Sequence, residues 1–156
     1  MTNSKSRTAA GTINPFVFVQ SGAVSASAVS GSDGILLALQ CTGTGVPIIG
    51  IGAEWTNAMM GTEWQTNFNP QGYPAATVGQ RIRVYEDGED TVMMVGSGYI
   101  VEPDDLLISD ASGNAVPLRL ATAASGTHWV GARAIEYGFP GDPIRVSVYT
   151  RPYTKP

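Results

Sequence analysis

The sequence contains two copies of the same pair of strings, and this repeat constrains the fold more than any other feature. Residues 46–55 read VPIIGIGAEW and residues 128–137 read HWVGARAIEY, so an apolar stretch with glycine and alanine ends twice in an acidic residue and an aromatic one. Each copy is followed by a related string, GQRIRVYE at 79–86 and GDPIRVSV at 141–148. Because content and order both repeat, we interpret the chain as a duplicated β unit.

Placing Gly50 on Gly131 and Gly79 on Gly141 leaves about twenty extra residues in the first copy. We therefore expect an insertion loop at about 56–78. Within each IRV string the residues alternate, which is the period of a half-buried strand. One face is predicted to be apolar (Ile82, Val84, Ile144, Val146 and Val148) and the other to carry Arg83 and Arg145.

Turn signals separate many short strands of this kind. Asp87-Gly88 predicts a hairpin between 81–86 and 91–95, because this pair favours a turn whose twist matches the flanking strands. Ser112-Gly113-Asn114 is expected to join 106–109 to 115–118. About ten short strands at this spacing predict an all-β fold, either a small β-barrel, a β-tulip-like domain or a sandwich.

At 156 residues the chain fits one domain of ordinary size. Residues 1–12 are small and polar, so we expect them to form a mobile arm. Phe16-Val17-Phe18-Val19 follows as a short apolar run that could pair with a strand edge supplied by a partner. The predicted organisation is an extended N-terminal arm at 1–19 and a single β domain at 20–156.

Charge and cysteine content exclude several classes of function. Thirteen acidic residues stand against nine scattered basic ones, which argues against nucleic-acid binding because phosphate contacts need a basic patch. Cys41 is the only cysteine, so the chain cannot form an intrachain disulfide. Asn14-Pro15 interrupts the only candidate signal-peptide region, and no segment reaches membrane-spanning length.

No constellation for catalysis, cofactor binding or metal binding stands out. His128 is the single histidine and no GxSxG elbow accompanies it, so we predict a structural histidine and no enzymatic activity. Glu86, Asp87, Glu89 and Asp90 could gather around calcium, but a solvated turn explains them more simply. Gly43-Thr44-Gly45 lacks the lysine of a phosphate loop, and one Cys with one His cannot supply a zinc site.

Residues 98–118, GYIVEPDDLLISDASGNAVPL, resemble the pattern of the bacteriophage capsid cement (head decoration) protein family. That pattern has a glycine, a short strand, a Pro/Gly-Asp turn before two apolar residues, an Asp-Ala-x-Gly turn and Val-Pro. The following WVGARAIEYGFPGDPIRVSV is similar to the family's closing segment. Pro103-Asp104-Asp105 departs from the more usual Pro-Gly-Asp, and the insertion matches no family motif.

The resemblance implies a virion structural protein, made in the host cytoplasm, that binds the outer surface of the phage head. There it would cement neighbouring subunits of the major capsid protein, and many relatives are homotrimers. Relatives also use an N-terminal arm that adds a strand to a capsid loop, which would assign partner binding to Phe16, Val17, Phe18 and Val19. Aromatic residues of the insertion, Trp64, Phe68 and Tyr73, are further candidates because interfaces are enriched in Trp and Tyr.

Two other functions remain open from the residues alone. A carbohydrate-binding or adhesive β module would present Trp64 or Tyr73 as an exposed stacking face. An unrecognised hydrolase would need paired acid and base groups, and the sequence shows none in a recognisable pattern.

Overall fold

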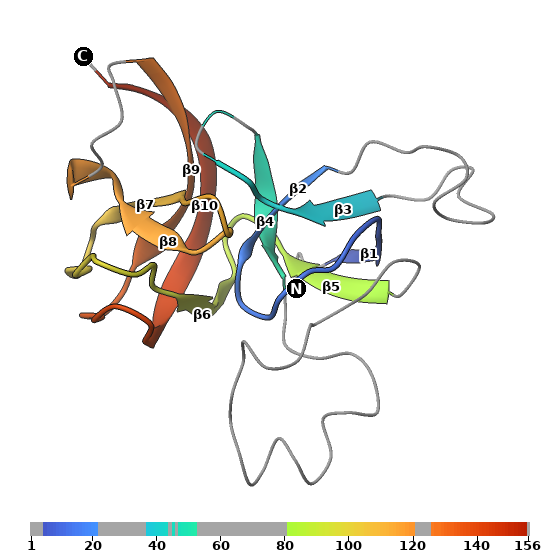
Figure 1. Ribbon diagram of the computed structural model, residues 1–156, viewed down its shortest axis with the longest axis horizontal. Coiled ribbons are helices and arrows are strands. Elements are labelled where there is room, and N and C mark those ends of the chain that lie inside the picture. Colours follow the sequence, from blue (N-terminus) through green and yellow to red (C-terminus); the bar gives the residue numbers. More distant parts are fainter. Residues whose placement is uncertain are drawn as a thin grey trace, which may run out of the picture.

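The computed structural model describes residues 5–21, 37–43, 45, 47–52, 81–120 and 126–155. These residues form strands and one short 3-10 helix (Figure 1). The strands are β1 (Lys5–Ala9), β2 (Phe18–Ser21), β3 (Leu37–Gln40), β4 (Ile48–Gly52), β5 (Arg81–Tyr85), β6 (Asp90–Met94), β7 (Leu106–Ser109), β8 (Ala115–Pro117), β9 (Gly126–Ala134) and β10 (Pro143–Lys155), and the helix is η2 (Leu118–Leu120). The predicted all-β class is confirmed.

The strands form two sheets that lie side by side (Figure 1). We call β1 to β5 the first unit; they close into a barrel in the order β1-β3-β2-β4-β5. We call β6 to β10 the second unit; they form a five-stranded sheet in the order β6-β10-β9-β7-β8.

Both units have the same strand arrangement, because β1-β5-β4-β2-β3 in the first matches β6-β10-β9-β7-β8 in the second. The register matches as well. Lys5 lies opposite Val84, and its counterpart Thr91 lies opposite Val146. The duplication therefore covers all five strands, which is more than the two repeated strings had indicated.

The strand pairing corrects the alignment of the two copies by one residue. Gly52 lies opposite Val84 in the first unit, and Ala134 lies opposite Val146 in the second. Gly52 therefore corresponds to Ala134, whereas placing Gly50 on Gly131 would have matched Gly52 with Arg133.

The units differ at the seam between their outermost strands. In the first unit a parallel ladder joins β1 to β3, with Thr8 opposite Leu37 and Ala9 opposite Ala38, and this ladder closes the barrel. In the second unit the equivalent contact is a single parallel bridge between Val95 and Ala115. The second unit is thus a nearly closed barrel with an opening beside that bridge.

The predicted N-terminal arm at 1–19 is wrong for residues 5–19. Residues 5–9 form β1, which pairs with both β3 and β5, and residues 16–19 are buried. The small side chains that indicated a mobile segment fit a strand in which Thr8 and Ala9 are both buried, with Ala9 in the apolar cluster of the first barrel. The domain boundary predicted at residue 20 is wrong for the same reason.

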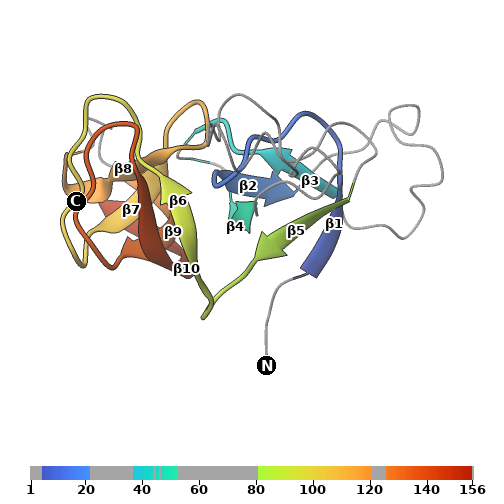
Figure 2. The same ribbon diagram turned by 90° about the horizontal axis from the view of Figure 1, so that it is seen from below.

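The predicted hairpin at Asp87-Gly88 is also wrong, although the turn exists. Gly88 has φ 90° and Glu89 N donates to Glu86 O at 3.2 Å, but β5 and β6 pair within different sheets. Figure 2 shows the two strands diverging from this turn. Ser112-Gly113-Asn114, in contrast, joins the paired strands β7 and β8 as predicted.

The predicted alternation of the IRV strings is confirmed. Ile82, Val84, Ile144, Val146 and Val148 are buried, whereas Arg83 and Arg145 are exposed. One apolar cluster, which includes Val17, Val19 and Ile82, fills the first barrel. A second and larger cluster combines second-unit residues with Phe18, Ile48 and Ile51 of the first unit, so the two units share a core.

Deleting residues 1–9 tests whether β1 is part of the fold. The deletion leaves β3 and β5 without their partner, and each lost backbone hydrogen bond costs about 1 kcal/mol. We expect the free energy of unfolding in urea to fall by several kcal/mol. Deleting only residues 1–4 leaves β1 whole and is the control. Equal stability of the two truncated proteins would contradict the closed barrel.

Candidate functional site

The segment that leads into β2 connects the two units. Met94 N donates to Phe16 O at 3.0 Å, and Phe18 N donates to Gly113 O at 2.8 Å. Met94 and Asn114 are the counterparts of Thr8 and Leu37, which pair in the first unit. The segment therefore occupies the opening of the second unit, where the pair equivalent to Thr8 and Leu37 is not formed.

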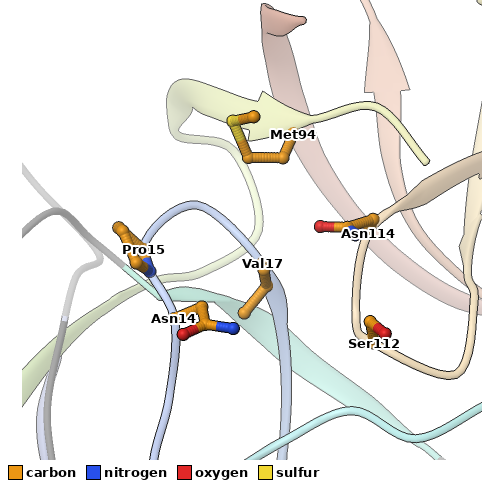
Figure 3. Close-up of a pocket in the computed structure, with 6 residues that line it drawn as sticks. All are labelled: Asn14, Pro15, Val17, Met94, Ser112 and Asn114. Atoms are coloured by element: carbon orange, nitrogen blue, oxygen red, sulfur yellow. The ribbon is translucent and has the colours of Figure 1, made fainter. Parts of the chain in front are cut away.

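A pocket of about 160 Å³ lies at this junction (Figure 3). It is lined by Asn14, Pro15, Val17, Met94, Ser112 and Asn114. The side chain of Gln40 ties its two walls together, because its Nε2 donates to Ser112 O at 2.8 Å and its Oε1 accepts from Asn14 N at 2.9 Å. The lining is neutral, so the pocket offers hydrogen bonds without charge.

The ring of Phe18 fills the space next to Gly131. A Cβ atom built on Gly131 would lie 2.4 Å from Cε1 of Phe18, which is closer than carbon atoms can approach. Phe18 is fully buried. Only glycine at position 131 leaves room for the Phe18 ring. Through this contact β2 of the first unit packs directly on β9 of the second unit.

The counterpart of the junction segment in the second unit is exposed. Pro15-Phe16 corresponds to Pro103-Asp104, and the second residue of each pair has a positive φ, 61° for Phe16 and 70° for Asp104. Phe16 N donates to Gly52 O at 3.1 Å, and Asp104 N donates to the equivalent Ala134 O at 2.8 Å. Both are tight turns that begin with proline, and each directs the chain into the strand that follows, β2 or β7.

A second pocket, of about 240 Å³, lies against this exposed turn. It is lined by Asp104, Asp105, Leu106, Leu118, Arg119 and Tyr153. Arg119 Nε donates to Asp105 Oδ1 at 2.8 Å, and this side-chain hydrogen bond raises the pKa of Arg119. The Arg119 cation is therefore already paired within the pocket.

An exposed apolar row follows β9. Tyr137 is 65% exposed and Phe139 59%, and Ile135, which is 39% exposed, lies at the bend that precedes them. The bridge between Val101 and Gly138 brings Ile100, 47% exposed, next to this row. Large apolar side chains gathered on a surface mark contact sites more often than scattered ones do.

The turn aspartates have structural roles. Asp110 Oδ1 accepts from Ser112 N at 2.8 Å and Asn114 N at 2.9 Å, and Asp105 Oδ2 accepts from Glu102 N at 2.8 Å.

The single cysteine, Cys41, and the single histidine, His128, are buried. Within the described ranges no three His, Cys, Asp or Glu side chains gather in a way that could hold a metal ion.

Four of the predicted partner-binding residues are corrected. Phe16, Val17, Phe18 and Val19 are at most 6% exposed, because they pack into the barrel and the junction. They form an internal interface in place of an external one. Trp64, Phe68 and Tyr73, with the insertion that contains them, lie outside the described residues.

Neither the second pocket nor the apolar row was predicted from the sequence. A signal for the pocket was present, since INPFVFVQS at 13–21 and VEPDDLLIS at 101–109 are the same strand-entry segment. Both segments have a proline at the third position and a serine at the last, but the two residues after the proline are apolar in the first copy and acidic in the second. That difference hid the repeat.

Comparisons with family models and with curated proteins find no match. Among solved structures, the chain is similar to the head fiber gp8.5 N base in bacteriophage phi29, with a TM-score of 0.49 and 16% identity over 96% of this chain and 95% of that chain. Within the described residues, no helix has the length and apolar character needed to cross a membrane.

Replacing Gly131 with alanine tests the junction. The added methyl group must displace the Phe18 ring, and overpacking of this kind costs about 1–3 kcal/mol. Thermal or urea unfolding of Gly131→Ala should show that loss. Gly43→Ala is the matched control, because a Cβ there meets nothing within 4 Å. Two variants of equal stability would show that the ring does not pack on Gly131.

Proposed function

We propose that this protein is a structural protein of a bacteriophage virion that binds the outer surface of the head. It cements neighbouring subunits of the major capsid protein and acts as a homotrimer. Its action is mechanical: each contact with a second subunit adds to the free energy needed to separate the shell. Attachment at several points raises occupancy beyond the affinity of one contact.

The geometry of the turns carries this proposal. The family pattern usually has glycine at the position of Asp104, whose φ of 70° is the conformation that glycine adopts most easily. The two other turn glycines of the pattern, Gly113 and Gly141, have φ 81° and 83°. The glycine positions of the family pattern therefore fall where this backbone has a positive φ. This agreement supports a β architecture shared with the family.

The exposed apolar row supports a contact role for this part of the chain. Ile135, Tyr137 and Phe139 lie within the segment that resembles the family's closing strands. Glu136 Oε1 accepts from Arg145 N at 2.8 Å, so the backbone that carries the row is fixed against β10. A preorganised apolar surface loses little entropy on binding. We assign capsid contact to this row.

Co-sedimentation with intact phage heads tests the proposal. Wild-type protein should sediment with the heads, and the double variant Tyr137→Ser with Phe139→Ser should bind at least tenfold more weakly. Its stability should stay within about 0.5 kcal/mol of wild type, because both side chains are exposed.

Leu120→Ser serves as a control, since Leu120 is 41% exposed and outside the row. Failure of the wild-type protein to sediment with the heads would refute the cement function. Light scattering on purified protein measures the trimer separately, and a monomer at all concentrations would refute the oligomeric part.

A further inference from the structure

The turn at Pro103-Asp104 in the second unit corresponds to the turn at Pro15-Phe16 in the first. The turn at Pro15-Phe16 contacts the other unit, whereas the turn at Pro103-Asp104 faces solvent. In the first unit Phe16 O accepts from Met94 N. Its counterpart, Asp104 O, accepts no hydrogen bond from any backbone N–H in the described part of the chain. The same backbone turn is thus satisfied by another segment in one copy and left open in the other.

The side chains around the open copy define what can bind there. Leu106, Leu118 and the ring of Tyr153 supply apolar walls, and Tyr153 is 41% exposed. Asp105 is paired with Arg119 at 2.8 Å. Asp104 has a much looser partner, Arg133 at 4.0 Å, and its side chain is 87% exposed. Among the carboxylates of Glu102, Asp104 and Asp105, that of Asp104 is the most exposed and has the longest ion-pair distance, so it is the one most available to a ligand.

We propose that this pocket binds an extended peptide segment of a protein partner that carries a lysine or arginine. A backbone N–H of the segment donates to Asp104 O, as Met94 N does to Phe16 O. The aliphatic part of the basic side chain packs on Leu106, Leu118 and Tyr153, and its cation meets the Asp104 carboxylate. Charge complementarity selects this ligand, because three carboxylates at the turn (Glu102, Asp104 and Asp105) face two arginines (Arg119 and Arg133).

A titration followed by NMR tests this site on the full-length protein. The probe is an acetylated and amidated pentapeptide, Thr-Val-Lys-Val-Thr, which favours an extended backbone. A second peptide with norleucine in place of lysine keeps the aliphatic part and removes the charge. The amide signals of Asp104, Leu106, Leu118 and Tyr153 should shift, and the lysine peptide should bind about two- to five-fold tighter at low salt.

Asp104→Asn removes the charge and keeps a residue that tolerates positive φ, so the turn should be preserved. This variant should lose the preference for the lysine peptide. Asp90→Asn makes the same charge change on the exposed start of β6 and should keep the preference. Tyr153→Ala should weaken binding of both peptides.

The proposal would be overturned by no shift at the pocket with either peptide, by a lysine preference that survives in Asp104→Asn, or by equal binding of both peptides to wild type. Shifts of the same signals with protein concentration alone would show that a second copy fills the pocket, which also overturns it. The titration contains no phage heads, so its outcome and that of the co-sedimentation are independent.

Discussion

The packing of Phe18 on Gly131 makes one core out of two repeated units. Side chains alternate along strand β2 and the residue before it, so Val17 and Val19 face the first barrel while Phe18 faces the second unit. A single strand thus contributes to two apolar clusters. Because buried first-unit side chains complete the larger cluster, the second unit depends on the first for its interior, and the duplicated halves form one cooperative structure.

The opening of the second unit explains why the halves are joined in this way. A barrel has no free strand edge only when its outermost strands pair. The first unit achieves this with the ladder between β1 and β3. The second has one bridge, and the Phe16–Phe18 segment supplies the remaining contacts at Met94 and Gly113. The edge left open by one repeat is thus covered by the other.

The sequence predicts local features well and long-range pairing poorly. The alternation of the IRV strings and the turn at Gly113 follow from neighbouring residues, and both are confirmed. Strand β1 could not be recognised, because Lys5–Ala9 is polar and its partners lie far along the chain. Asp87-Gly88 specifies a reversal of the chain but not which strands pair after it. The correspondence between the turn at Asp104, beside the second pocket, and the turn at Phe16 follows only from the strand registers of both units, which the sequence does not show.

The turns at Pro15-Phe16 and Pro103-Asp104 have the same backbone conformation but different side chains after the proline. A positive φ on a residue with a side chain costs about 1–2 kcal/mol, and yet Phe16 and Asp104 both adopt it. The hydrogen bonds to Gly52 O and Ala134 O explain this, because the turn must deliver its N–H to the neighbouring strand in each unit. The side chains have no such constraint, so they follow their surroundings: aromatic where the turn is covered, acidic where it faces solvent. The backbone of the turn therefore belongs to the fold, and its side chains determine what it contacts.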